Sequence, residues 1–294
     1  MSSDDYLDVQ GFPGGFTVLM AVYEKDDPDL FIRAIDSVYQ NDIKPDHTIL
    51  VVDGPVPIKL EKQIGFTQQQ YGIEIVRLDK SSGLAVALNI GLRHINTEWV
   101  VRADADDYNL PQRFRCIAEL LHKQPDLDII GSNILEIERD GTPVARRVMP
   151  TKHAQIYKFL SRRSPFNHMT VAFRRSLVEH CGGYPNIYLR EDYALWIVMI
   201  TSGAKCANID EVLVHATAGR DLYRRRGGWR YACAEIDLQK LMVRCGIKSW
   251  FRAVLEGIGR ASVFLAPSFL RCLIYEKILR HPVNKINHTA RGLN

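Results

Sequence analysis

The sequence lacks the features that mark disulfide-bonded, zinc-binding and membrane-spanning proteins. Its six cysteines are scattered along 294 residues, without a Cys-x-x-Cys pair or a histidine at zinc-ligand spacing. We therefore expect free thiols in a reducing compartment. The first residues, Met1 to Asp5, are polar and acidic, and we expect no signal peptide. No apolar run reaches the roughly eighteen residues that a membrane-spanning helix needs, so we expect no such helix.

Other absences narrow the class of protein. The chain has no internal repeat and no low-complexity tract. No nucleic-acid-binding motif accompanies its basic residues, so we expect no nucleic acid partner. What remains is an ordinary globular composition, 46% hydrophobic and 24% charged, in a chain long enough for one large domain or for a domain with an appendage.

Charge is distributed unevenly. Residues 220–294 hold fifteen Lys or Arg against five Asp or Glu, a balance of +10, so the first 219 residues carry −6 of the total of +4. This contrast indicates an acidic catalytic body and a basic tail directed at an anionic partner.

The first half of the chain alternates apolar strands with helices. Strands are expected over 16–23, 48–52, 73–78 and 98–103, and helices over 28–39, 56–70 and 84–95. This rhythm predicts a parallel sheet with helices on both faces, in which ligands bind beyond the carboxyl ends of the strands. Tyr23, Asp53 and Asp104 all fall at strand ends and are expected to line one crevice.

The second half is less regular. Helices are expected over 111–123, 156–160 and 193–201, and strands over 129–131, 134–138 and 169–173, with a hairpin turn at 139–142. The last of these helices is opened by Arg190-Glu191-Asp192.

The stretch from Val100 to Asp107 is the strongest chemical signal. Two β-branched residues run into three carboxylates, and strand alternation would place Asp104 and Asp106 on the same face. Carboxylates so close repel each other unless a cation lies between them. Mg²⁺ and Mn²⁺ prefer oxygen ligands and are often completed by substrate phosphates. The sequence therefore predicts a divalent metal facing a diphosphate, with a solvated acidic turn as the alternative.

Four further features have both a functional and a structural interpretation. Asp192, in the first turn of a helix, is either a helix cap or a general base. Asp53 is either a turn residue or a hydrogen-bond acceptor for a nucleotide base or ribose. His168 and His215 are either packed histidines or ligands. Arg224 to Gly228 is either a basic surface loop or a flexible loop that closes on a diphosphate.

Residues 250–280 alternate apolar patches with bases. The longest apolar run is about ten residues, too short to span a membrane but suited to helices that lie in a membrane interface. The alternative is a helical hairpin packed on the domain or on another subunit.

A set of motifs then falls in a recognisable order. The residues that carry it are Val18 to Gln40, Val51-Val52-Asp53-Gly54, Gly83-Leu84-Ala85, Ala87-Leu88-Asn89, Gly91-Leu92, Arg102 to Asp107, Pro111, Arg113, His168, Gly182-Gly183-Tyr184, Glu191-Asp192-Tyr193, Leu195-Trp196 and Tyr223 to Gly228. Over residues 15–228 this order resembles the family 2 glycosyltransferases of bacterial O-antigen, capsule and exopolysaccharide synthesis, including the amylovoran type.

The resemblance implies a fold and a domain division. It implies a GT-A fold, an α/β Rossmann-like architecture with a mixed, mostly parallel central sheet flanked by helices. The domain would cover residues 1–228, with a nucleotide-sugar half over 15–107 and an acceptor half over 108–228. Residues 229–294 would form a helical, basic, amphipathic extension that associates with the membrane.

The resemblance also implies roles for individual residues. Asp192 matches the catalytic base, and Glu191 and His168 match acceptor-binding positions. Asp106 matches the principal metal ligand, with Asp104 shared between metal and donor, and the metal would be Mn²⁺ or Mg²⁺. The positions matched to nucleotide-sugar binding are Ala21, Tyr23, Glu24, Asp53, Gly83, Arg102, Asp104, Arg225 and Arg226.

Two positions depart from the family pattern. The usual Asp-Asp-Gly-Ser is here Val52-Asp53-Gly54-Pro55, with one carboxylate fewer for base recognition. Ala216-Thr217 stands where related enzymes often have an aromatic residue and an arginine, which leaves the role of His215 open.

The implied activity is inverting, metal-dependent transfer of a sugar from a nucleotide-sugar, with a UDP-sugar favoured. The acceptor would be a hydroxyl of an undecaprenyl-diphosphate-linked saccharide at the cytoplasmic face of the bacterial inner membrane, reached by a peripheral enzyme. A homo-oligomer is left open. The alternatives are a sugar nucleotidyltransferase and a non-catalytic membrane-surface scaffold of a polysaccharide assembly complex.

Overall fold

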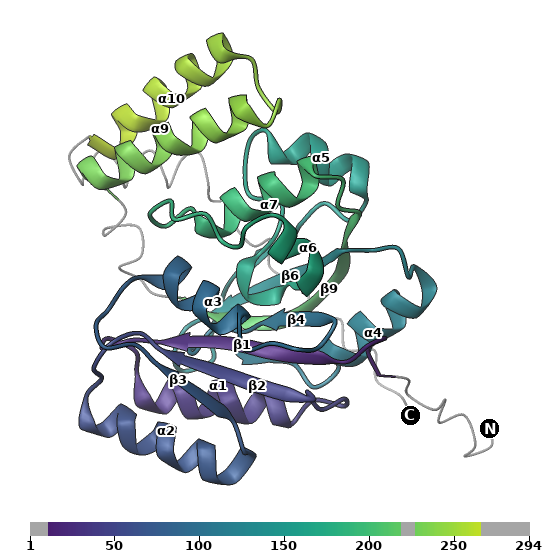
Figure 1. The fold of residues 1–294 in the computed structure, drawn as a ribbon, viewed down its shortest axis with the longest axis vertical. Helices are drawn as coiled ribbons and strands as arrows, with labels where there is room; N and C mark the ends of the chain where they lie inside the picture. Colours follow the sequence, from purple (N-terminus) through teal and green to yellow (C-terminus); the bar gives the residue numbers. More distant parts are fainter. Residues whose placement is uncertain (1–10, 219–226, 266–294) are drawn as a thin grey trace, which may run out of the picture.

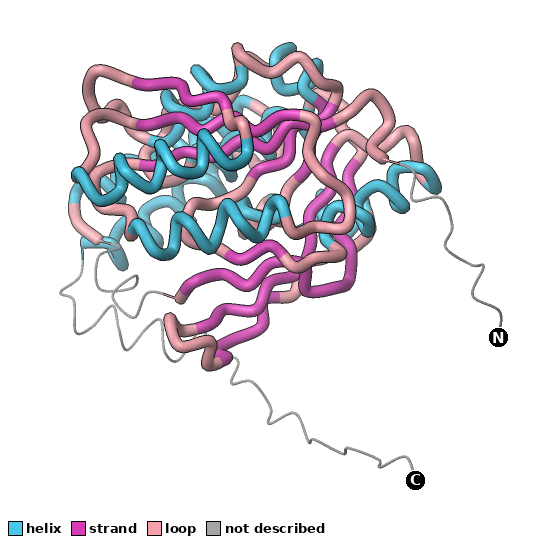
Figure 2. The backbone as a smooth tube through the Cα atoms, turned by 90° about the horizontal axis from the view of Figure 1, so that it is seen from below, coloured by secondary structure: helices cyan, strands magenta, loops and turns pink. Residues whose placement is uncertain are grey.

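The computed structural model describes residues 11–218 and 227–265, organised around one nine-stranded sheet (Figures 1 and 2). The strands are β1 (Phe16–Val22), β2 (His47–Val52), β3 (Glu74–Arg77), β4 (Trp99–Arg102), β5 (Tyr108–Asn109), β6 (Ile129–Ile137), β7 (Pro143–Arg147), β8 (Ala172–Arg174) and β9 (Cys206–Thr217). Their order is β3-β2-β1-β4-β8-β6-β9-β5, and β7 pairs with β6.

The helices lie between these strands and after them. They are α1 (Pro28–Tyr39), α2 (Ile58–Tyr71), α3 (Leu84–Leu92), α4 (Arg113–Lys123), α5 (His153–Leu160), the 3₁₀ turn η1 (His168–Thr170), α6 (Arg175–His180), α7 (Glu191–Thr201), α9 (Trp229–Arg244) and α10 (Trp250–Leu265). The start of α1 follows the sequence signals, because the Asp27 side chain accepts the amide hydrogens of Asp29 and Leu30 and Pro28 takes the first helical position.

The mixed α/β sheet implied by the family resemblance is confirmed, and the parallel arrangement predicted from the strand and helix pattern holds for the first four strands. Strands β3, β2, β1 and β4 are all parallel, so their carboxyl ends meet at one edge. Beyond β4 the sheet changes character: β8 runs antiparallel to β4 and β6, whereas β6 and β9 are parallel. The ends of β1, β2 and β4 are therefore the place where the candidate site is expected.

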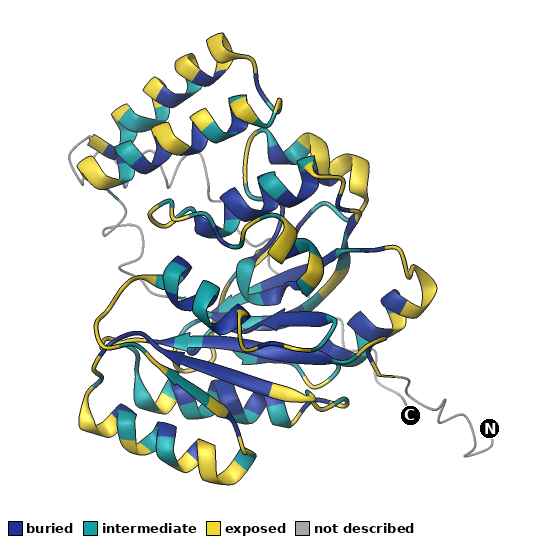
Figure 3. Cartoon of the chain, in the orientation of Figure 1, coloured by how far each residue is buried: buried dark blue, intermediate teal, exposed yellow. Residues whose placement is uncertain are grey.

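Side chains along the buried strands point alternately to the two faces of the sheet, so the buried residues form one core cluster on each face (Figure 3). On β1, Val18 and Met20 face the cluster covered by α1, α2 and α4, while Leu19 faces the cluster covered by α3, α5, α6 and α7. Both faces of the sheet are thus covered, as the continuous apolar runs predict.

Helix α7 is buried almost all round, which is why its sequence is apolar on every face. The outermost layer is a pair of helices, α9 and α10, stacked beyond α7 (Figure 1). We call this pair the C-terminal hairpin. Within the described ranges, none of the helices has both the length and the apolar content to cross a membrane.

Two local expectations need correction. The strand expected over 169–173 is the turn η1 followed by the shorter β8, and the two pieces expected over 129–138 form the single strand β6. The structure also contains elements that were not among those expected: strands β5, β7 and β9 and helix α6. Helix α6 has only six residues, too few to show a helical period, and the inner alternation of β9 is broken by exposed Asp210 and Glu211.

Candidate active site

Three carboxylates lie together where β4 ends, and we call Asp104 to Asp107 the acidic turn. The strand stops at Arg102, so the strand alternation used to pair Asp104 with Asp106 does not reach them. A turn brings them together instead, because Ala103 and Ala105 are buried and fix its inner side. Carboxylate oxygens of Asp104, Asp106 and Asp107 all lie within 4.8 Å of one another.

Two buried arginines lie beneath the acidic turn. Arg102 is 1% exposed; its guanidinium forms an ion pair with Asp104 and donates to the carbonyl of Ala103. Arg113 is fully buried and donates to the carbonyl of Arg102 at 2.8 Å and to the side chain of Asn109. Arg102 was predicted to bind the donor. In this structure its guanidinium is bonded to Asp104 instead, so it would influence a donor through that carboxylate.

The end of β9 holds the other side of the acidic turn. The Thr217 amide donates to Asp107 Oδ1 at 2.8 Å, and its hydroxyl donates to the carbonyl of Asp106. Arg33, from α1, donates to the Thr217 hydroxyl at 3.0 Å. Thr217 was noted in the sequence only as a departure from the family pattern, and Arg33 belongs to no motif; the pairing of β5 with β9 brings the end of β9 to the acidic turn.

Crowding and burial disfavour the ionised carboxylates. Burial raises the pKa of Asp106 to about 7, with added repulsion from Asp104 and Asp26. Burial followed by the charges of Asp104 and Asp106 raises the pKa of Asp107 well above its usual range. The pKa of nearby Asp26 rises to about 6, mainly by burial. A cation would relieve this repulsion.

These residues fit a divalent metal. Asp107 Oδ2 is buried and has no hydrogen-bond partner among the residues that the structure describes. An orphaned carboxylate oxygen beside two others is the donor set that Mg²⁺ and Mn²⁺ prefer. Asp104 and Asp106 were predicted as ligands; Asp107 is the member that the family pattern did not supply.

Asp53, after β2, holds the turn that opens α3. Its carboxylate accepts the amides of Ser82 at 2.6 Å and Gly83 at 3.0 Å, and the hydroxyl of Ser81 at 3.1 Å. Gly54 permits this close approach, since a Cβ there would lie 2.5 Å from the Ser81 nitrogen. The two oxygens of Asp53 offer about four acceptor positions, so the three bonds still leave room for a nucleotide contact.

The end of β1 contributes the remaining predicted donor residues. Ala21 is half-buried, while Tyr23 is 41% exposed and Glu24 is exposed. The Tyr23 amide donates to Asp26 at 2.9 Å, which fixes the bend after the strand. These side chains lie at the same sheet edge as Asp53 and Asp104.

The loop after α6 joins the two halves of the site. Gly183 has a φ of +82°, and a Cβ there would lie 2.3 Å from the Asn89 side-chain oxygen on α3. This close approach lets Asn89 bond both the amide of Tyr184 at 2.7 Å and its carbonyl at 2.8 Å. Asn89 thus ties the Gly182-Gly183-Tyr184 turn, which precedes α7, to the helix that Asp53 anchors.

Glu191 and Asp192 form the first turn of α7, where the positive end of the helix favours carboxylates. Asp192 is half-buried and Glu191 is buried. Burial, followed by the charge of Asp192, raises the pKa of Glu191 to about 7.

His168 and Tyr184 lie between α7 and the acidic turn. Their side chains are hydrogen-bonded, with His168 Nε2 3.0 Å from the Tyr184 hydroxyl, and His168 also packs against Trp196. Burial lowers the pKa of His168 to about 4, and the charges of Arg102, Asp192 and Asp104 all act on it. The histidine is therefore neutral at physiological pH and lies within reach of charges on α7 and on the acidic turn.

Three predicted residues remain. Arg225 and Arg226 lie outside the described residues. His215 lies on β9 opposite Tyr108, with ring centres 6.3 Å apart, and burial lowers its pKa. It lies two residues from Thr217 at the rim of the acidic turn.

Comparison with known proteins decides the family. Residues 17–182 match the model of glycosyl transferase family 2. The chain belongs to this family. It is 38% identical over 266 residues to the Escherichia coli UDP-Gal:alpha-D-GlcNAc-diphosphoundecaprenol beta-1,3-galactosyltransferase, covering 90% of this chain and 96% of that protein. It is 32% identical to the amylovoran biosynthesis glycosyltransferase AmsE of Erwinia amylovora, covering 89% of this chain and 98% of that protein.

Solved structures of glycosyltransferases share the fold. S. aureus TarS 1-349 in complex with UDP-GlcNAc superimposes with a TM-score of 0.66 at 14% identity, over 91% of this chain and 76% of that one. The mannosyltransferase PcManGT from Pyrobaculum calidifontis, in complex with GDP-Man and Mn²⁺, gives 0.61 at 16% identity, over 92% and 81%. The GT-A architecture expected from the resemblance is confirmed, and the chain is a glycosyltransferase.

The raised pKa of Glu191 predicts how the free energy of unfolding depends on pH. Since its folded pKa of about 7 lies above the ordinary 4.5, ionised Glu191 destabilises the fold above pH 7, and this penalty disappears as pH falls toward 4.5. Glu191→Gln should therefore be more stable than the wild type at pH 8, by on the order of 3 kcal/mol, with a gap that closes by pH 4.5. Urea unfolding at both pH values measures this; a gap independent of pH contradicts it.

Proposed function

We propose that this glycosyltransferase moves a sugar from a UDP-sugar to a hydroxyl of a saccharide linked to undecaprenyl diphosphate, with inversion at the anomeric carbon and with a divalent metal. The observation that carries the proposal is that His168 and Tyr184, which are hydrogen-bonded to each other, are both within reach of the charges of Asp104 in the acidic turn and of Asp192 in the first turn of α7. The E. coli relative, named for UDP-Gal and a diphosphoundecaprenol acceptor, supports the substrate classes.

On the donor side, residues at the ends of β1, β2 and β4 surround the nucleotide. Tyr23 and Asp53 would contact the base or ribose, with Ala21, Glu24 and Gly83 forming the adjacent wall. Asp106, Asp104 and Asp107 would hold Mn²⁺ or Mg²⁺. When bound, that ion neutralises the diphosphate as it leaves. Buried Arg102 and Arg113 keep the acidic turn rigid beneath it.

On the acceptor side, Asp192 would take the proton of the attacking hydroxyl, which approaches the anomeric carbon from the face opposite the diphosphate. A single displacement of this kind inverts the configuration. Glu191 and neutral His168 would orient the acceptor. Buried Glu191 is a hydrogen-bond donor whenever it holds a proton, and its pKa of about 7 keeps that form well populated near neutral pH.

A membrane surface is the expected location of a lipid-linked acceptor, and α10 offers a matching face. Its inner residues Ala253, Gly257 and Phe264 are buried. Its outer side exposes a helical stripe of large apolar residues, Trp250, Phe251, Val254, Leu255 and Ile258. Residues 227–265 carry six Lys or Arg against three Asp or Glu, which suits an anionic leaflet. We propose that this stripe docks on the membrane.

The proposed base is tested by Asp192→Asn. The substitution removes the proton acceptor while keeping shape, so we expect kcat for transfer from UDP-galactose to a GlcNAc-diphosphate-lipid acceptor to fall at least about 10³-fold. The Kd for UDP-galactose should change less than twofold.

Surface variant Asp126→Asn, which changes an exposed carboxylate paired with Lys205 and outside the predicted site, controls for the loss of one negative charge. Transfer by Asp192→Asn at the wild-type rate would exclude Asp192 as the base.

The membrane proposal is tested by Phe251→Ser and Leu255→Ser. Each removes an exposed apolar side chain from α10, and we expect binding to phosphatidylglycerol-rich vesicles to weaken about tenfold for each. Ile58→Ser, which changes an equally exposed residue on α2, should bind like the wild type. Flotation assays measure this, and unchanged binding by both α10 variants contradicts the docking surface.

A further inference from the structure

The loop that leads into α7 contains a strained residue. Leu189 has a φ of +52°, the only positive φ of a non-glycine residue in the part of the chain that the structure describes. A bulky side chain in this region costs roughly 1 kcal/mol or more and persists only where the surroundings hold it. Leu189 lies three residues before Asp192, so whatever holds it also sets the direction in which α7 begins.

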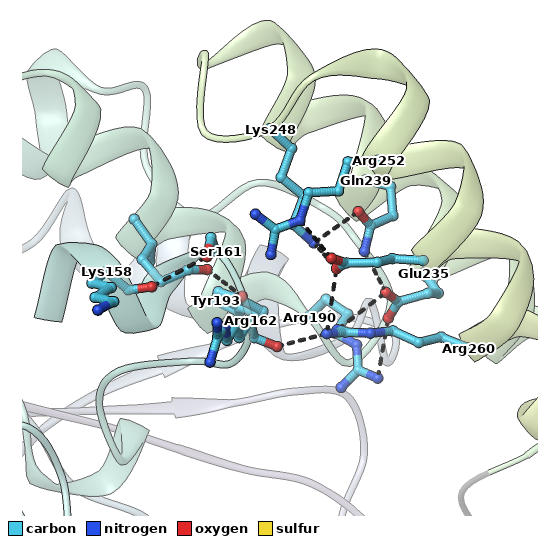
Figure 4. Close-up of polar contacts among 12 residues, drawn as sticks. Lys158, Ser161, Arg162, Arg190, Tyr193, Glu235, Gln239, Lys248, Arg252 and Arg260 are labelled. Carbon is cyan, nitrogen blue, oxygen red and sulfur yellow. Dashed lines mark hydrogen bonds and ion pairs between the residues drawn. The ribbon is translucent and has the colours of Figure 1, made fainter. Parts of the chain in front are cut away.

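On one side of Leu189, Arg190 is held by a buried carboxylate of α9. Glu235 is 1% exposed, and its Oε2 lies 3.7 Å from a guanidinium nitrogen of Arg190. The other oxygen accepts from Gln239 at 2.8 Å and from Arg260 at 3.4 Å (Figure 4). A carboxylate this buried requires such partners. The Arg190 guanidinium also lies over the Phe264 ring of α10, at 5.6 Å.

On the other side, Tyr188 is held by the start of α9. The Arg230 guanidinium lies 4.3 Å from the centre of its ring, and the Tyr231 ring packs edge-on at 5.6 Å. The C-terminal hairpin therefore contacts the side chains of both residues that flank Leu189, namely Tyr188 and Arg190.

The hairpin is itself locked by the same network. The Lys248 side chain is completely buried, and its ammonium donates to Glu256 at 2.6 Å and to Gln239 at 3.1 Å. Arg260 donates to the carbonyl of Arg162, beyond the end of α5, at 2.7 Å. Figure 4 shows these polar contacts converging from α9, α10 and the loop before α7 around buried Glu235. Charges placed in this way resist sliding of the hairpin, because any shift would leave a buried ion without a partner.

We propose that Glu235 is a positioning residue of the active site: through Arg190 it holds the strained entry of α7, so that Glu191 and Asp192 face the donor. The C-terminal hairpin is then a working part of the catalytic unit and not only a surface attachment. The claim that Glu235 supports catalysis rests on the proposed function, whereas the claim that Glu235 holds the entry of α7 does not.

The test compares Glu235→Gln with Asp237→Asn. Glu235→Gln keeps the size of the side chain and its bond to Gln239 but loses the attraction for Arg190. Asp237→Asn removes an exposed carboxylate of the same helix, paired only with Lys240 among the described residues. Hydrogen exchange of residues 186–193 should become at least about tenfold faster in Glu235→Gln and stay unchanged in Asp237→Asn.

The kinetics of sugar transfer should also distinguish Glu235→Gln from Asp237→Asn. We expect kcat for transfer to fall at least about tenfold in Glu235→Gln, because small misplacements of catalytic groups have effects of this size or larger, with the donor Kd within twofold of wild type. Glu235→Gln and Arg190→Gln should be non-additive, the double variant being no slower than the slower single one. Glu235→Asp should recover part of kcat.

A folded Glu235→Gln variant with wild-type exchange and kcat overturns the inference, as does a lower Tm with unchanged kcat. If Glu235→Gln does not fold, Arg190→Gln removes the same contact from its more exposed side and is judged by the same criteria. A wild-type protein that transfers no sugar refutes the proposed function, while the exchange experiment still decides whether Glu235 holds the loop.

Discussion

Mutual repulsion among three carboxylates at the end of β4 is the constraint on which the rest of the site depends. Asp104, Asp106 and Asp107 are held within 4.8 Å of one another by buried alanines, and two buried arginines beneath them offset only part of the charge. Burial in the first place, and the neighbouring carboxylates in the second, raise the pKa values of Asp106 and Asp107. A fold keeps such a cluster when a cation and an anionic ligand complete it.

The sheet brings residues from both halves of the chain to the acidic turn. Parallel strands place the ends of β1, β2 and β4 at one edge, while β9 returns alongside to offer Thr217 to the acidic turn. Asn89 ties the turn before α7 to α3, and Glu235 ties the entry of α7 to the C-terminal hairpin. The donor residues are thus fixed by the sheet, and the first turn of α7 is fixed by helix packing.

Local chemistry made much of this predictable from the sequence. The apolar runs of β1, β2 and β4, the Asp27 cap and the carboxylates after β4 are all short-range signals, and each indicated the correct element. The convergence of Asp104 with Asp106 was expected for the wrong reason, since a turn and not strand alternation brings them together. Asp107 was not singled out as a ligand, and Thr217 was noted only as a departure from the family pattern. Arg33 and Glu235 were missed because their partners lie between 25 and 184 positions away. Pairing over such distances leaves no periodic trace in the chain.

The central claim is that the acidic turn binds a divalent metal together with a nucleotide diphosphate. The most direct test is calorimetric titration with UDP-, GDP- and dTDP-sugars, with Mn²⁺ and then with chelator, in the wild type, in Asp106→Asn and in the surface variant Asp126→Asn. We predict that a UDP-sugar binds in the presence of Mn²⁺, that chelator weakens this binding at least about tenfold, and that Asp106→Asn removes the metal dependence while Asp126→Asn keeps it. UDP-sugar binding that is equal with and without chelator, or the same in Asp106→Asn as in the wild type, would contradict the claim.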